Sequence, residues 1–288
     1  MAVGTTRGKR RLGRFIKPIR VRSGRKPEEI ATLAVCSKQT VYRLESGDAL
    51  PSLHRFTTVL GLIGATEEER RRALHLWEVA DGDTAVIEHA GDLPANYRRF
   101  RMDECEAVRE RTLDTVIVPG MLQTADYAAE IHRAARPRTS RLVRENWAAD
   151  ERRDRQSLLL RPGRRLALHS LIDEAVLRRM IGGPSVMAAQ LDHLLTMSRE
   201  PEITIQVVPF TFGAYGAMSG PVTIFTFPED GEPDSAYLEY VAGGQSLEDE
   251  DDVAGLSAVW YQIANSAPSP AESAEIIRTA RDLLGTHV

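Results

Sequence analysis

The stretch KPEEIATLAVCSKQTVYRLESG, residues 26 to 47, decides the fold of the N-terminal part of this chain. Its pattern is that of two short helices joined by a tight turn. Ile30 and Ala34 mark the buried side of the first helix, and Val41 and Leu44 mark that of the second, because residues three or four positions apart share one helical face. The stretch therefore predicts a helix-turn-helix.

The second of these helices carries long polar side chains on its outward face, with Ser37 placed as the N-cap. Arginine and lysine match the acceptors O6 and N7 of guanine, and glutamine matches the N6 and N7 of adenine. Such donors at the N-terminal end of a short exposed helix are typical of a helix that enters the major groove of DNA. We therefore predict that DNA is contacted by Ser37, Lys38, Gln39, Thr40, Tyr42 and Arg43.

The charge of the chain is divided unevenly along the sequence. The whole chain has 37 Lys and Arg against 41 Asp and Glu, a formal charge of −4. Residues 1–47 hold 12 basic and three acidic residues, which gives +9 and leaves −13 for the other 241 residues. A basic module on an acidic body indicates a polyanion as partner of the first part only. The alternative is a solvated basic tail, since the basic residues of 1–11 precede any periodic segment.

Length and composition bound the class of protein. A chain of 288 residues has room for two domains with a core each. No apolar run approaches the roughly 18–20 residues that a membrane span needs, and the basic N-terminus leads into no apolar segment of a secretory signal. Cys36 and Cys105 are too few for a disulfide framework or a four-ligand zinc site. We expect a cytoplasmic protein without a membrane partner.

The predicted fold class is α+β, with an N-terminal all-α domain of five helices followed by a larger mixed domain. Leu12 and Ile19 delimit the apolar repeat of the first helix, and Thr66 with Glu69 forms a capping box at the start of the fifth. We expect four segments: a disordered basic arm at 1–11, the helix-turn-helix domain at 12–80, a linker at 81–96, and the C-terminal domain at 97–288.

In the C-terminal domain the periodicity alternates between helical and extended segments. It predicts helices at 101–111, 123–135, 173–181, 184–199, 249–266 and 270–284. It predicts strands at 165–172, 203–208, 221–227 and 236–241. Strands that cluster after helices favour an α+β domain over alternating strand–helix–strand units.

Four longer motifs add a resemblance to a known family: VPGMLQTADYA (118–128), LIDEAVLRRMIGGPSVMAAQLDHLL (171–195), ITIQVVPF (203–210) and YLEYVAGGQSLED (237–249). Residues 12–78 resemble the lambda-repressor-like, Xre-type helix-turn-helix class. Residues 88–284 resemble the large C-terminal domain of unknown function carried by WhiJ-like actinobacterial regulators. The resemblance implies a transcriptional regulator, often encoded beside a small partner protein. It also implies base contacts by Lys38, Gln39 and Arg43, with Ser37 and Thr40 nearer the backbone.

Three residues depart from the pattern of the helix-turn-helix class. Pro18 falls inside the first helix, where proline costs about 3 kcal/mol. Val35 stands at the turn position that usually holds glycine, so either the turn is remodelled or a β-branched residue adopts a positive φ. Pro27 replaces a residue that can donate to a phosphate. These departures make loss of DNA binding the main alternative.

The sequence offers no convincing catalytic set, metal site or cofactor motif. Its seven histidines form no ligand pair, and no Walker loop, dinucleotide fingerprint or nucleophile elbow occurs. His169 and Asp173 could form a base with an orienting carboxylate, but a strand-face histidine beside an N-capping aspartate is the preferred interpretation. Glu239, if buried, needs a partner such as Arg109 or Arg178. We expect a ligand or ion-pair site at Arg109, Gln123, Arg178 and Glu239.

Three functions follow in order of preference. The first is a sequence-specific DNA-binding regulator of transcription, acting as a homodimer, whose C-terminal domain senses a small molecule or binds a partner protein. The second is a helix-turn-helix relic whose C-terminal domain binds or transforms a small molecule of a biosynthetic pathway. The third is a protein-interaction module that antagonises another regulator. An enzyme ranks last.

Overall fold

The computed structural model describes residues 6–82, 95–139, 147–228, 232–241 and 243–284. The chain divides into two compact units, residues 1–106 and residues 107–288, and each is described by itself. The predicted fold class is confirmed, since a helical N-terminal region is followed by a mixed α+β domain. The boundary between the units lies ten residues beyond the predicted end of the linker.

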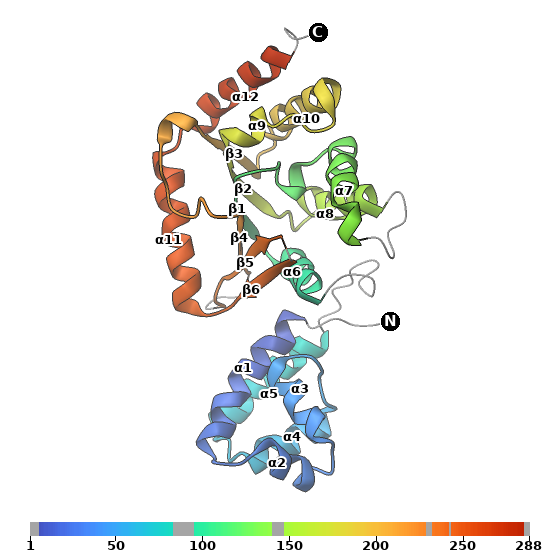
Figure 1. The fold of residues 1–288 in the computed structure, drawn as a ribbon. Helices are drawn as coiled ribbons and strands as arrows, with labels where there is room; N and C mark the ends of the chain where they lie inside the picture. Colours follow the sequence, from blue (N-terminus) through green and yellow to red (C-terminus); the bar gives the residue numbers. More distant parts are fainter. Residues whose placement is uncertain (1–5, 83–94, 140–146, 229–231, 242, 285–288) are drawn as a thin grey trace. The chain divides into compact units, whose positions relative to one another are not determined.

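The first unit consists of helices, as Figure 1 shows in blue to blue-green. The predicted five-helix domain corresponds to α1 to α5, and α6 follows the undescribed residues 83–94. Their bounds are α1 Arg7–Arg22, α2 Pro27–Leu33, α3 Lys38–Ser46, α4 Leu53–Leu62, α5 Glu67–Gly82 and α6 Ala95–Glu106.

One apolar core holds α1 to α5 together. Leu12, Ile30, Phe56 and Leu60 are fully buried in it, and Val41 and Leu44 of α3 are 2% exposed. At about 25 cal/mol per Å² of apolar surface, this shared core is the main stabilising term of the domain. The helix-turn-helix pair is therefore part of a packed bundle.

The expected helix starts are largely confirmed. Thr66 and Glu69 form the capping box, with Thr66 N donating to Glu69 Oε2 at 2.9 Å and Glu69 N donating to Thr66 Oγ1 at 3.2 Å. Pro27 is the first residue of α2, where its missing N–H is harmless. Pro18 lies inside α1 on the exposed side, and the helix continues through it to Arg22.

The basic arm differs from the expectation over 1–11. Residues 1–5 lie outside the described residues, and α1 already begins at Arg7 with Thr6 as its N-cap. The sequence pattern missed this start because the first turn of α1, RGKR, carries no apolar residue and therefore no periodicity.

The second unit is built on a six-stranded sheet with the order β3-β2-β1-β4-β5-β6. The strands are β1 Arg109–Asp114, β2 Ala167–Asp173, β3 Ile203–Val208, β4 Val222–Thr226, β5 Ser235–Tyr240 and β6 Gly243–Leu247. The pairs β1–β2 and β2–β3 are parallel, whereas β1–β4, β4–β5 and β5–β6 are antiparallel. The central strand β1 therefore joins a parallel half to an antiparallel half.

Helices cover both faces of this sheet (Figure 1): α11 lies along one face, and α7 and α8 lie on the other. Among the described residues, the helices of this unit are α7 Ala125–Thr139, α8 Trp147–Leu160, α9 Glu174–Arg178, α10 Gly183–Met197, α11 Glu250–Ser266 and α12 Pro270–Leu284, with 3-10 turns at Gly120–Leu122 and Phe210–Phe212. Trp260 of α11 is buried against the sheet and donates from Nε1 to the carbonyl oxygen of Thr112 at 2.9 Å.

Most predicted elements of this unit are present within a few residues, and β3 has the predicted bounds. The prediction of a helix through 111 is wrong, because α6 ends at Glu106 and β1 begins at Arg109. Strand β6 and helix α8 were not predicted. The preference against strand–helix–strand units is wrong for the parallel half, where α7 and α8 connect β1 to β2 and α9 and α10 connect β2 to β3.

Candidate nucleic-acid interface

Helix α3 has the capped start and the exposed outward face that the sequence predicts. The Ser37 hydroxyl accepts from Thr40 N at 3.2 Å and lies 3.0 Å from the Thr40 hydroxyl. Lys38, Gln39 and Arg43 are exposed, and their side chains make no hydrogen bond or ion pair to the described residues. Three long donors therefore project from one side of a helix whose other side is buried.

Two glycines bring α1 and α3 into close contact beneath this face. A Cβ atom on Gly13 of α1 would lie 2.5 Å from the carbonyl oxygen of Glu45, and one on Gly47 would lie 2.6 Å from the Cα atom of Arg10. Gly47 also ends α3 with a φ of +76°, a conformation that favours glycine. The backbones of α1 and α3 thus touch, which fixes the position of α3 on the bundle.

An ion pair reinforces the same contact between α1 and α3. The Arg20 guanidinium binds the Glu45 carboxylate through both Nε and Nη2, the latter at 3.1 Å from Oε2, and Nη1 donates to the carbonyl oxygen of Arg25 at 2.9 Å. The hydrogen bond to Glu45 raises the pKa of Arg20 above its usual value. Arg20 is therefore engaged within the domain.

Tyr42 joins the two helices of the motif. Its hydroxyl donates to Glu28 Oε1 at 2.9 Å, and this bond raises the pKa of Tyr42. The pKa of Glu28 is lowered, first by its own backbone N–H and then by the Tyr42 hydroxyl. Tyr42 is 48% exposed, so the ring remains on the surface while the hydroxyl holds α2 against α3.

The turn between α2 and α3 has a positive φ at Val35, where the class that the sequence resembles usually has glycine. Val35 has a φ of +49° and is 83% exposed. A β-branched residue in this region is strained by about 1–2 kcal/mol. Of the two alternatives stated for Val35, the structure therefore has the strained turn and no remodelling.

Several basic residues of the first 47 are engaged within the first unit. Arg7 and Arg10 are 4% and 3% exposed, and Arg10 forms an ion pair with Asp103. Arg22 binds both carboxylate oxygens of Glu69 at 2.7 Å, which lowers the pKa of Glu69 to about 2. The +9 charge of 1–47 therefore overstates the charge available to a polyanion.

The four residues of the expected ligand site do not converge. Arg109 pairs with Thr226 at one end of β4. Glu239 is exposed near the end of β5 and lies beyond the other end of β4, so the two side chains are at opposite ends of that strand. Arg178 binds Glu174 at 2.9 Å within α9. Gln123 is buried, and it donates to the carbonyl oxygen of Val118 at 2.7 Å and accepts from Arg152 at 2.9 Å.

His169 takes the preferred interpretation of a strand-face histidine. Its Nε2 lies 2.7 Å from Gln206 Oε1, and its ring makes an edge contact with Trp260. Burial lowers the pKa of His169, so the ring is neutral near pH 7. Asp173 caps α9 by accepting from Ala175 N at 2.8 Å, as expected.

Asp114 is a buried carboxyl group that the sequence did not single out. It ends β1, and its Oδ2 is buried without a hydrogen-bond partner among the described residues. Burial raises the pKa of Asp114 to about 7, with a smaller contribution from the charge of Glu239 and an opposing hydrogen bond from Thr112. The signal was hidden because β1 was not predicted: residues 109–111 were assigned to the end of a helix, and residues 112–114 to no element.

The described residues contain no group of three or more His, Cys, Asp or Glu that could hold a metal ion. Over the same ranges, no helix combines the length and apolarity that crossing a membrane requires.

Comparison with known proteins gives two matches to family models. The model described as "Domain of unknown function (DUF5753)" matches residues 97–279, and the model described as "Helix-turn-helix domain" matches residues 11–73. No curated protein and no solved structure matches the chain. The helix-turn-helix match begins within α1, covers α2 to α4 and ends in the first half of α5, and it supports a DNA-binding regulator.

Proposed function

The chain belongs to the DUF5753 family, and from this premise we propose that it is a sequence-specific DNA-binding regulator of transcription. One observation carries the proposal: α3 has a capped N-terminus, one face buried in the domain core and the opposite face exposed, with Lys38, Gln39 and Arg43 on the exposed face. These are the side chains that can discriminate base edges in the major groove.

In this proposal the residues of α3 divide the work. Lys38, Gln39 and Arg43 contact bases, while Ser37 and Thr40 lie nearer the phosphates at the N-terminus of the helix. Tyr42 remains at the interface through its ring, with its hydroxyl bound to Glu28. Arg7 and Arg10 are buried, so neither is available for the minor-groove contacts that residues of an N-terminal basic arm can make.

The other parts of the proposal concern partners. The protein acts in the cytoplasm. It binds DNA as a homodimer, because operators bound by helix-turn-helix proteins are commonly two-fold symmetric. Its C-terminal domain senses a small molecule or binds a small partner protein encoded nearby. Since the domain follows the DNA-binding unit in one chain, either event can change the affinity for DNA through a coupling free energy.

The test is the substitution Arg43→Ala, measured on the operator found by selection from random duplexes. Loss of a base contact weakens specific binding by about 1–3 kcal/mol and changes nonspecific binding much less. The matched control is Arg71→Ala, which removes an exposed arginine from α5. Equal losses on operator and scrambled duplexes would reject the assignment of Arg43.

A second function is favoured by the strained turn at Val35, which departs from the DNA-binding class. In it the helix-turn-helix is a relic, and the C-terminal domain binds or transforms a small molecule. Selection from random duplexes distinguishes the two functions, because a relic enriches no sequence. A steep fall of affinity with salt would show electrostatic binding only, so sequence enrichment is the deciding result.

A further inference from the structure

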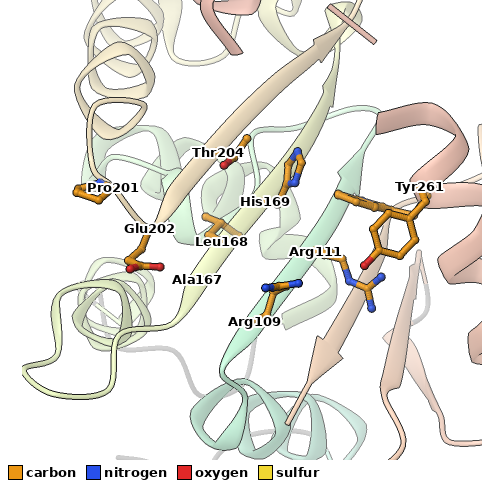
Figure 2. Close-up of a pocket in the computed structure, with 10 residues that line it drawn as sticks. Arg109, Arg111, Ala167, Leu168, His169, Pro201, Glu202, Thr204 and Tyr261 are labelled. Carbon is orange, nitrogen blue, oxygen red and sulfur yellow. The ribbon is translucent and has the colours of Figure 1, made fainter. Parts of the chain in front are cut away.

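A cavity of about 240 Å³ opens on the face of the sheet that α11 covers (Figure 2). It lies within the second unit, between strands β1, β2 and β3 and helix α11. Ligand pockets for drug-sized molecules measure about 300–1,000 Å³, so this cavity suits a smaller ligand. The lining residues that matter here are Arg109, Arg111, His169, Thr204, Trp260 and Tyr261.

Arg111 is the chemical centre of the cavity. Its side chain is only 3% exposed, and Nη2 binds Asp234 Oδ2 at 2.5 Å. Nε and Nη1 are buried and have no hydrogen-bond partner among the described residues. A buried N–H group without an acceptor costs about 1–3 kcal/mol, and more when it is charged, so these two donors call for an acceptor.

Two aromatic rings lie against the same guanidinium. The Arg111 Cζ atom is 4.9 Å from the ring centre of Tyr261 and 5.7 Å from that of Trp260. Figure 2 shows Tyr261 beside Arg111 at the edge of the cavity. These cation–π contacts stabilise the charge, but a ring face does not replace an oxygen acceptor for the N–H groups.

Register places two further polar side chains beside Arg111. Arg111 pairs with His169 and His169 pairs with Thr204, so the three side chains lie in one row across β1, β2 and β3. Gln206 donates to the carbonyl oxygens of Ala264 and Pro268, which turns its own oxygen toward His169. His169 is thereby fixed and adds no second buried charge.

The balance of charge around the cavity favours an anion. Arg109 and Arg111 both line it, whereas the one carboxylate in its lining, Glu202, is exposed. Asp234 is already bound to Arg111, so Arg109 adds a positive charge at the opening. Arginine binds carboxylates through charge-assisted hydrogen bonds, and aromatic walls bind flat rings.

We propose that this cavity binds a small flat organic carboxylate, with its carboxylate on Arg111 and Arg109 and its ring against Trp260 and Tyr261. The cavity volume of about 240 Å³ is sufficient for one aromatic ring with its carboxylate. This inference deepens the sensing part of the proposed function, because it names the class of small molecule and the site. It does not depend on DNA binding by α3.

The test uses the full-length protein without DNA and benzoate as the probe. Titration calorimetry and thermal unfolding are measured with benzoate, with benzamide as the uncharged isostere, and with inorganic phosphate. We expect saturable binding of benzoate and a rise in Tm, with benzamide and phosphate at least tenfold weaker. Loss of a charged hydrogen bond changes affinity by about ten- to a hundredfold.

Three variants locate the site. Arg111→Met removes the two buried donors and abolishes benzoate binding, and its circular dichroism spectrum checks the fold. Arg111 also binds Asp234, so a second variant that spares this ion pair is needed. Arg109 is exposed, and Arg109→Gln should therefore weaken benzoate binding several-fold without unfolding the protein. Arg179→Gln, at the residue that caps the C-terminus of α9 outside the cavity lining, is the matched control and should bind as the wild type does.

The outcomes separate this inference from the proposed function. Equal benzoate affinity in wild type, Arg109→Gln and folded Arg111→Met would overturn the site. Equal affinity for benzamide or phosphate would overturn the flat carboxylate as ligand class. Operator binding is measured independently of these titrations, so its failure rejects the role of α3 and leaves the cavity untouched.

Discussion

The exposed face of α3 and the α11-facing side of β1 both carry arginines, but they hold them in opposite ways. On α3, Arg43 and Lys38 are exposed to solvent, and the buried side of the helix includes close backbone contacts at Gly13 and Gly47. On β1, Arg111 is buried among aromatic rings and bound to Asp234.

The difference concerns what each region requires of a partner. An exposed cation has little desolvation penalty, so α3 can approach a polyanion and exchange counterions without rearrangement. A buried guanidinium has already lost its water, and it therefore favours a partner that supplies oxygen acceptors. The first surface is suited to a large partner of repeating charge, and the second to one small ligand.

The largest effect is expected from Gly47→Ala, which tests whether α3 depends on backbone contact with α1. The new methyl group meets the Arg10 backbone at 2.6 Å in a conformation with a φ of +76°, so we expect a loss of about 3–5 kcal/mol of unfolding free energy in urea titration. The control Gly64→Ala has a similar φ of +65° but open space around it, and it should lose about 1–2 kcal/mol. Equal losses would show that the close contact is unimportant.

The next effect concerns the buried charge of the sheet unit at Asp114. A carboxyl group whose pKa rises from 3.8 to about 7 on folding binds its proton more tightly in the folded state. Stability contributed by this group is therefore greatest below pH 3.8 and falls as the pH rises to about 7. Asp114→Asn removes this dependence.

The free energy of unfolding, measured from pH 4 to pH 8, checks the direction of this dependence. As the pH rises across this range, the free energy of unfolding of Asp114→Asn should increase relative to that of the wild type by on the order of 2–4 kcal/mol, since one pKa unit corresponds to about 1.4 kcal/mol. Asp126→Asn, an exposed aspartate of α7, is the matched control and should follow the wild-type curve. Parallel curves for wild type and Asp114→Asn would mean that the carboxyl group is not desolvated.

The smallest effect is expected at the turn before α3. Val35→Gly relieves the positive φ of an exposed residue, and the gain of about 1–2 kcal/mol is partly offset by the greater freedom of glycine in the unfolded chain. We expect a net rise of about 0.5–1 kcal/mol in thermal or urea unfolding. Val35→Ala keeps the Cβ atom and should leave stability almost unchanged, so an equal gain for alanine would exclude relief of backbone strain.

The helix-turn-helix could be predicted from sequence because its signals are local. The apolar spacing of α3, the N-cap Ser37 and the capping box of α5 all depend on residues within one or two turns, and each is present in the structure. The close contact at Gly13 was not predictable in this way. It depends on the carbonyl oxygen of Glu45, 32 positions away, and a glycine in a helix gives no sign of what faces it.

The central strand was missed because its residues are atypical of a buried strand. The sequence RERTLD of β1 has four charged residues out of six, and Arg111 is buried only because the rings of α11 and Asp234 come from positions more than 100 residues away. Strand β6 was missed because GGQSL begins with two glycines and has little β propensity. Where burial depends on distant partners, periodicity alone misassigns the element.

The position of β1 between a parallel and an antiparallel neighbour also sets the order in which the sheet can assemble during synthesis on the ribosome. The residues of α1 to α5 are all synthesised before those of β1, so their shared core can form first. Strand β1 ends at Asp114, yet its partner β4 ends at Thr226, so at about 5–20 residues per second the strand waits roughly 6–22 s for that neighbour. During this interval its unpaired edge is open to other chains, which makes the nascent sheet, and not the helix-turn-helix, the part that most needs protection from aggregation.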